Sequence, residues 1–327
     1  MMKNIFLIGG GGYVGSALVP KLLELGYNVA VYDLFIYGKE VLENHKNLSL
    51  IKGDVRDLKL LETKLKGFDF IIHLACISND PSFELNPKLG KTINLDCFRP
   101  LVEIAKKQNI KRFIYASSSS VYGIKAEKNV IESLSLEPLT DYSKYKVECE
   151  KILNEYTSDN FETVIIRPAT VCGYAKRQRL DLVVNILTNL AFNNRKIKVF
   201  GGEQLRPNIH IEDMADIYLK VLIADKNLVN GEIFNAGYDN FKVMDIALAV
   251  KDILGDDIII ETYPTDDNRS YHVSSDKIQK TLNFLPKYTI RDAIRDLKLA
   301  FMANKLPNSL EDSKYFNIKK MQEINLK

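Results

Sequence analysis

Four consecutive glycines, Gly9 to Gly12, follow an apolar run and precede a helical pattern near the start of the chain. Residues 5–8 are all apolar, as in a strand that is buried on both faces. After the glycines, apolar residues recur at helical spacing, and Gly26 can end that helix. Because glycine is costly to order, this run indicates a backbone requirement and not a flexible turn. We expect Pro20 to kink the helix or to shorten its first half, because proline removes a main-chain hydrogen bond.

The order of strand, glycine turn and helix is typical of a dinucleotide-binding fingerprint. Gly9 would make the tight turn, Gly12 would let the backbone approach a pyrophosphate, and Gly15 would let the helix pack closely on its strand. The pyrophosphate would lie at the helix N-terminus, where free N–H groups favour an anion. Asp33 ends the next apolar run, where an acid binds the adenosine ribose. Since its carboxylate would repel a 2′-phosphate, the sequence predicts NAD and not NADP.

The overall composition is ordinary for a soluble globular protein, with 46% hydrophobic and 27% charged residues. A formal charge of +3 is too balanced for an electrostatic nucleic-acid binder. No apolar run approaches the ~20 residues of a membrane span, and the N-terminus lacks a signal-peptide pattern. We therefore expect a cytoplasmic protein without membrane or nucleic-acid partners. The scattered cysteines predict free thiols and no metal site; they are Cys76, Cys97, Cys149 and Cys172.

Apolar runs alternate with helical patterns along the first part of the chain, which predicts a parallel sheet covered on both faces. The fold class is therefore α/β, a Rossmann-type doubly wound sheet, which we assign to residues 1–170. The expected strands are 4–8, 28–32, 48–51, 69–74, 111–116 and 162–166. The expected helices are 13–25, 57–66, 92–108 and 142–157.

From about residue 171 the pattern changes to a smaller α/β lobe, which we expect to bind the substrate and to extend to residue 327. Parts of about 203–237 are expected to return to the first domain. The expected helices are 177–192, 243–254, 274–282 and 290–303, the expected strands lie near 197–202, 231–237 and 258–262, and 207–224 is expected to form a strand and then a helix. The polar tail 308–327 is expected to lie along the surface.

Tyr142 and Lys146 stand four residues apart at the start of an expected helix, so they lie on one face, one turn apart. A neighbouring ammonium favours the phenolate and lowers the pKa of a tyrosine from its usual value of about 10. Taken alone, such a pair is more often a surface pair. Upstream, four serines, 117–120, follow a buried strand at the position where ligands bind in an open α/β sheet. One or two of them would face the cofactor, and the others would cap the next turn.

Together these stretches resemble the extended short-chain dehydrogenase/reductases, in the branch of nucleotide-sugar epimerases and dehydratases. The resemblance covers nearly the whole chain. Its motifs are the glycine run, Asp33, GDVRD (53–57), HLAC (73–76), INLD (93–96), SSSSVYG (117–123), YSKYK (142–146), RPATVCG (167–173), RPNIHIEDMA (206–215) and DNRSYHVSSDKI (267–278).

The resemblance implies roles for individual residues. Ser118, Tyr142 and Lys146 would be catalytic, and Asn94 would help to fix the active-site helix. The expected cofactor-binding residues are Gly9, Gly12, Tyr13, Val14, Gly15, Asp33, Asp54, Val55, Leu74, Ala75, Tyr142 and Lys146. The expected substrate-binding residues are Ser119, Arg206 and Arg269, the two arginines holding the diphosphate. His73 and His210 are expected to be structural.

The implied reaction starts when Tyr142 takes a proton from a sugar hydroxyl, most simply at position 4, while hydride passes to NAD. Ser119 and Ser120 stand where the family's 4,6-dehydratases carry an Asp–Glu pair, so dehydration is disfavoured. The resemblance therefore implies a nucleotide-sugar 4-epimerase that works through a 4-keto intermediate.

Two alternatives stay open. RLDLVVN (179–185) and NPKLGKTIN (86–94) resemble a subgroup that includes GDP-heptose 4-dehydrogenases, so a net dehydrogenase or ketoreductase is the second interpretation. Thr170 and Cys172 also differ from the residues typical of hexose epimerases. The third interpretation is a scaffold that senses the dinucleotide without turnover.

The resemblance also implies a homodimer, because helices at 92–108 and 142–157 form an intersubunit bundle in the family. Apolar contacts would come from Leu95, Phe98, Leu101 and Val102.

Overall fold

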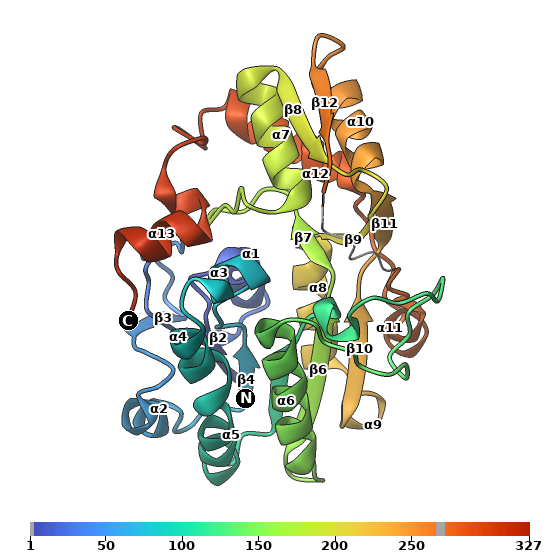
Figure 1. Ribbon diagram of the computed structural model, residues 1–327. Coiled ribbons are helices and arrows are strands. Elements are labelled where there is room, and N and C mark those ends of the chain that lie inside the picture. Colours follow the sequence, from blue (N-terminus) through green and yellow to red (C-terminus); the bar gives the residue numbers. More distant parts are fainter. Residues whose placement is uncertain (1–2, 266–271) are drawn as a thin grey trace.

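The computed structural model describes residues 3–265 and 272–327, whose arrangement is shown in Figure 1. Seven parallel strands form one sheet in the order β10-β6-β5-β4-β1-β2-β3. This confirms the predicted doubly wound α/β fold. The strand bounds are β1 (Asn4–Ile8), β2 (Asn28–Asp33), β3 (Leu48–Lys52), β4 (Phe70–His73), β5 (Arg112–Ala116), β6 (Glu162–Pro168) and β10 (Glu232–Ala236).

Both faces of this sheet are buried, as the continuous apolar runs predict. Ile5 and Leu7 of β1 pack in one core cluster with helices α1 and α8, while Phe6 and Ile8 pack in a second cluster with α2, α5 and α6. Successive side chains thus enter opposite layers of the three-layer arrangement. The helix bounds are α1 (Tyr13–Glu24), α2 (Leu58–Lys64), α5 (Phe98–Lys107), α6 (Asp141–Glu155) and α8 (Ile211–Ile223).

The strand order reverses between β1 and β4, which places a crevice at the carboxyl ends of these strands. In register, Leu7 pairs with Ile72 and Ile8 with His73, so the loops after both strands leave the sheet at the same level. This crevice is where an open α/β sheet binds its ligand.

The remaining elements form two small sheets with their own helices. Strands β7 (Thr170–Cys172), β9 (Leu205–His210) and β11 (Asp239–Lys242) make a three-stranded sheet, and β8 (Lys196–Phe200) pairs in parallel with β12 (Ile259–Tyr263). Helices α7 (Val183–Asn194), α10 (Val243–Leu254) and α12 (Ile290–Met302) share one core with them. Strand β10 instead belongs to the large sheet, and helix α8 packs on one face of that sheet. A domain boundary near residue 170 stays a prediction.

Two expected helices differ from the structure. The helix predicted at 177–192 starts only at Val183, because Leu182 is extended and side chains pin the residues before it: the Asn185 amide donates to the Arg179 carbonyl at 2.8 Å. The helix predicted at 92–108 is divided into α4 (Pro87–Lys91), a π-helical turn (Thr92–Asp96) and α5.

Two further expectations, for Pro20 and for the C-terminal tail, are corrected. Helix α1 runs without interruption through Pro20, which lies on its exposed side, while Leu18 and Leu22 are buried. The tail is not wholly a surface segment, because it forms helix α13 (Asn317–Glu323) with Asn317 and Met321 buried.

The apolar contacts expected between subunits are also wrong in part. Phe98, Leu101 and Val102 are almost fully buried against the sheet of their own chain, so they cannot contact a partner. Leu95 packs at the edge of the same cluster. Among the described residues, no helix combines the length and the apolar character needed to cross a membrane.

Candidate active site

A cleft of about 470 Å³ opens at the switch between β1 and β4. Elements from both parts of the chain border it. All but one of the expected site residues line it: Gly9, Gly12, Tyr13, Val14, Gly15, Asp33, Asp54, Val55, Leu74, Ala75, Ser118, Ser119, Tyr142, Lys146 and Arg206. The exception, Arg269, lies outside the described residues.

The glycine turn has the geometry that a bound pyrophosphate needs. Gly9 has φ +86°, and a Cβ there would lie 2.4 Å from the Ala75 nitrogen. A Cβ on Gly15 would lie 2.3 Å from the Gly10 carbonyl oxygen, so the helix can approach the turn only without a side chain. Gly12 is the N-cap of α1 and no side chain caps it, which leaves the N–H groups of the first turn available to an anion.

Asp33 ends β2 with its carboxylate in the cleft. Oδ2 accepts a hydrogen bond from the Gly11 N–H at 2.9 Å, and Oδ1 accepts one from the Phe35 N–H at 2.7 Å. Burial raises the pKa of this carboxyl, and the two backbone donors and the nearby Arg177 charge oppose that rise. Two carboxylate oxygens beside the glycine turn fit the hydroxyls of a ribose.

Tyr13 connects the glycine turn to the second part of the chain. Its hydroxyl donates to the Gly173 carbonyl at 2.5 Å and accepts from the Asn185 amide at 3.1 Å. Burial raises the pKa of this tyrosine, so the hydroxyl stays neutral and serves as a tether.

Ser118, Tyr142 and Lys146 meet at one end of the cleft. Ser118 follows β5, and Tyr142 lies in the first turn of α6, near enough for Ser118 to oppose the rise of the Tyr142 pKa. Lys146 is buried one turn further, with Nζ 5.8 Å from the Tyr142 ring centroid and 2.6 Å from the Ala116 carbonyl oxygen that accepts its hydrogen bond. Thr140 and Ser143 form a capping box that fixes the start of α6.

In the cofactor-free chain the pKa of Tyr142 is raised. Burial is the main cause, and it raises the pKa well above that of free tyrosine; the nearby Cys76 adds to the rise, while Ser118 and Arg179 oppose it. Lys146 directs its ammonium to the Ala116 carbonyl. The prediction that Lys146 and the nicotinamide ring together lower this pKa concerns the NAD-bound enzyme and stays a prediction.

The four serines have different partners. Ser117 donates to the Glu150 carboxylate at 2.5 Å inside the core, and Ser118 accepts from the Ser120 N–H at 3.1 Å. Ser119 is buried at the wall of the cleft. The Asn94 side chain holds the Ile77 main chain, and its main-chain carbonyl accepts from the Cys149 thiol of α6.

Two arginines in the cleft were missed by the sequence analysis, because 177–192 was predicted to be a helix. Arg177 is 3% exposed, stacks on Tyr37 and donates to Asn317. Arg179 pairs with Asp181 at 2.9 Å and donates to Ser78 at 3.1 Å. The available signal was a pair of basic residues beside Gln178, ahead of an apolar stretch.

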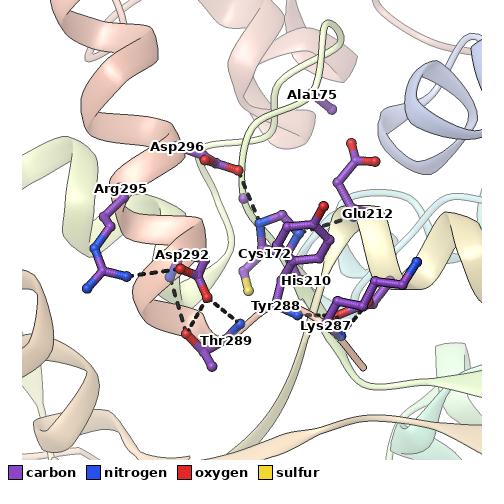
Figure 2. Close-up of polar contacts among 12 residues, drawn as sticks. Cys172, Ala175, His210, Glu212, Lys287, Tyr288, Thr289, Asp292, Arg295 and Asp296 are labelled. Atoms are coloured by element: carbon purple, nitrogen blue, oxygen red, sulfur yellow. Dashed lines mark hydrogen bonds and ion pairs between the residues drawn. The ribbon is translucent and has the colours of Figure 1, made fainter. Parts of the chain in front are cut away.

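The histidines have structural surroundings. His210 caps α8 by accepting from the Glu212 N–H, stacks on Tyr288 and lies 3.3 Å from Asp296, as Figure 2 shows. Burial lowers the pKa of His73 to about 3, so it is neutral beside Phe98. Within residues 3–265 and 272–327, no cluster of His, Cys, Asp or Glu could hold a metal ion.

Comparison with known proteins finds related sequences and similar structures. An uncharacterized protein, y4nG, of Sinorhizobium fredii is 29% identical over 75% of this chain, which spans 58% of that protein. A UDP-glucose 4-epimerase of Lactobacillus helveticus is 25% identical, and the match covers 87% of this chain and 92% of the epimerase. The structure of a UDP-N-acetylglucosamine 4-epimerase from Methanobrevibacter ruminantium, in complex with UDP-N-acetylmuramic acid, has a TM-score of 0.84 and 26% identity over 93% and 99% of the two chains.

The sequence profile of the NAD dependent epimerase/dehydratase family matches residues 5–237. The cleft fits the cofactor of that family, since it combines an uncapped helix N-terminus, a glycine turn without room for side chains and the Asp33 carboxylate. The chain is therefore an NAD-dependent enzyme of the epimerase/dehydratase family, in the extended branch of the short-chain dehydrogenase/reductases.

Proposed function

We propose that this enzyme is a nucleotide-sugar 4-epimerase that works through a 4-keto intermediate. The observation that carries the proposal is that Ser118, Tyr142 and Lys146 line the same cleft as the glycine turn, with the Lys146 ammonium 5.8 Å from the Tyr142 ring centroid. A tyrosine beside a second hydroxyl and an ammonium can take a proton from a sugar alcohol and return it.

In this mechanism Tyr142 accepts the proton of the 4-hydroxyl, and Ser118 holds the reacting oxygen by a hydrogen bond. Lys146 keeps Tyr142 oriented and favours the phenolate. Bound NAD supplies the acceptor of the hydride from C4 and later its donor. Return of the hydride to the opposite face of the sugar would invert C4 without net oxidation. Ser119, Arg206 and Arg269 would hold the substrate, the arginines through its diphosphate.

Dehydration is disfavoured because it needs an acid and a base for elimination. Ser119 and Ser120 have hydroxyls at those positions. Asp80 does line the cleft, but its carboxylate accepts a hydrogen bond from Thr140, the N-cap of α6, at 2.6 Å. That contact gives Asp80 a role in fixing the helix start.

A net 4-dehydrogenase or ketoreductase is the second candidate. It is favoured by the stretches 179–185 and 86–94, which reach the cleft through Arg179, Leu182 and Ile93. A scaffold without turnover is disfavoured because Ser118, Tyr142 and Lys146 are all present and line the same cleft.

The experiment is to incubate the purified enzyme with a panel of UDP-, GDP-, CDP- and dTDP-sugars, while NADH absorbance is followed and products are identified by NMR. A substrate deuterated at C4 should give a C4 epimer that keeps its deuterium, without accumulation of NADH. NADH and a keto sugar in equal amounts would identify a dehydrogenase. A product that has lost one water would identify a dehydratase.

A further inference from the structure

Arg177 is a buried cation whose charge is only partly compensated. Its side chain is 3% exposed and borders the cleft, and it enters no ion pair within the described part of the chain. Nη2 donates to the Asn317 side-chain oxygen at 2.6 Å, whereas Nε and Nη1 have no hydrogen-bond partner among the described residues. A buried guanidinium stays protonated and is costly without partners, so its free N–H groups point to an anionic ligand.

The position of Arg177 identifies the part of the ligand that it would meet. Its main-chain N–H donates to the Ser16 hydroxyl in the first turn of α1, at 3.2 Å. Its charge also reaches the Asp33 carboxylate, although that carboxylate is already bonded to the Gly11 and Phe35 N–H groups. Arg177 thus lies between the helix N-terminus and the ribose-binding acid, where the diphosphate of a dinucleotide passes.

The guanidinium is held in place by residues that are distant in sequence. It stacks on the Tyr37 ring at 3.6 Å, and the Tyr37 hydroxyl donates to the same Asn317 oxygen at 2.9 Å. Asn317 is fixed in turn, since its N–H donates to Asp181 and its amide donates to Ser78. The fork of Arg177 is therefore oriented before the ligand arrives, which reduces the entropy lost on binding.

The C-terminal segment 313–327 that carries Asn317 also covers the other end of the cofactor site. Met321 is buried in the cluster that contains Val55, and Leu326 packs against that cluster. The Lys327 carbonyl accepts from Arg56, the ion-pair partner of Asp54. Figure 1 shows α13 on the side of α3 (Asp80–Glu84), and the two helices are in contact.

We propose that Arg177, positioned by Asn317, binds the diphosphate of NAD, and that segment 313–327 thereby retains the cofactor. This inference rests on the NAD dependence of the family and is independent of the 4-epimerase assignment. A retained cofactor suits a reaction in which the hydride is removed and returned within one turnover.

The test measures cofactor binding and not turnover. The exchange rate of bound NAD against labelled NAD, and the Kd values of NAD and ADP-ribose, are compared for wild type and Arg177→Met. We expect about 10- to 100-fold weaker binding of both ligands and a faster exchange, from the loss of charge-assisted hydrogen bonds. Lys176→Met is the matched control, because Lys176 is its exposed neighbour and pairs with Glu43 at the surface.

Binding of UDP, GDP and NADP shows which phosphate group Arg177 contacts. UDP and GDP should bind equally to wild type and Arg177→Met; a loss confined to them would assign Arg177 to the substrate diphosphate and overturn the proposal. If wild type bound NADP more tightly than NAD and Arg177→Met abolished this difference, Arg177 would instead contact a 2′-phosphate. Unchanged NAD affinity and exchange would make it a purely structural residue.

Asn317→Asp separates positioning from folding. The new carboxylate would keep the contacts with Arg177 and Tyr37 but would neutralise the guanidinium. We expect unchanged or higher resistance to urea together with weaker NAD binding and faster exchange. Loss of stability with unchanged exchange would show that the segment only supports the fold.

Discussion

Arg167 and Glu150 form a bidentate ion pair in the interior, with Nη2 2.6 Å from Oε2 and Nε 3.0 Å from Oε1. Both side chains are at most 4% exposed. The carboxylate also accepts from Ser117, and the guanidinium donates to the Tyr122 hydroxyl at 2.8 Å. The pair thus connects β6, α6 and the serine loop that presents Ser118 to the cleft.

Arg167→Met should lower the free energy of unfolding by about 3–5 kcal/mol, because it leaves the Glu150 charge buried without a partner. Arg291→Met is the matched control, since Arg291 pairs with Asp252 at the surface, where such a pair contributes about 0–1 kcal/mol. Urea unfolding of both variants checks this. Equal losses would contradict the assigned importance of the interior pair.

Tyr142→Phe should reduce turnover by about 10²–10⁴-fold, because it removes the proton acceptor and keeps the ring. NAD affinity should change little. Tyr145→Phe, on the same helix and packed on Phe83, should stay near wild type. Single-turnover hydride transfer measures the effect, and a fast Tyr142→Phe enzyme would exclude the proposed base.

The phenol of Tyr142 should titrate above the usual tyrosine value in the cofactor-free enzyme, because burial raises its pKa. Its neutral form therefore persists as pH rises past about 10. Adding NAD should move phenolate formation to lower pH, since a nearby positive charge favours the anion. The measurement is the phenolate absorbance of wild type minus that of Tyr142→Phe across pH, with and without NAD. An NAD-independent curve would refute this effect of charge.

Asp33→Asn should weaken NAD binding about 10- to 100-fold and narrow the difference from NADP, because the amide cannot repel a 2′-phosphate. Oδ1 can still accept the Phe35 N–H, so the turn should persist. Glu24→Gln, at the exposed end of α1, is the control. Calorimetry with NAD and NADP measures the ratio of the two affinities. Equal affinities of the wild type for NAD and NADP would disprove the assignment of Asp33 to the ribose.

The exposed side of α5 and α6 should carry a homodimer interface. Because the apolar residues of α5 and α6 face inward, the exposed surface of these helices is charged and includes Arg99, Glu103 and Glu155. Sedimentation at micromolar concentration should show a dimer that Glu103→Arg weakens and Glu24→Arg, on α1, does not. A monomeric wild type would remove the prediction.

The features that the sequence predicts well are those encoded by neighbouring residues. The β1–α1 unit follows from apolar runs around a glycine turn, and Asp33 follows from its place at a strand end. The same local logic gives the Tyr142–Lys146 pair, because a four-residue spacing fixes the face of a helix.

The missed features depend on residues far apart in the chain. Residues 177–182 have a helical pattern, yet Arg177 is bonded to Asn317 and Asp181 accepts from the Asn317 N–H, across more than 130 residues. The raised pKa of Tyr142 in the cofactor-free chain also depends on its surroundings in the fold. The Tyr142–Lys146 spacing says nothing of burial or of the Ala116 carbonyl that holds the Lys146 ammonium.

The position of β10 at the edge of the large sheet has a consequence for synthesis on the ribosome. β6 is completed at Pro168, but its outer neighbour β10 ends only at Ala236, and α8 of the same segment covers Leu7 and Ile166. A nascent chain that ends between these points has an open strand edge and an uncovered apolar layer. Such surfaces pair readily with other chains, so this interval of translation is when the protein most needs a chaperone.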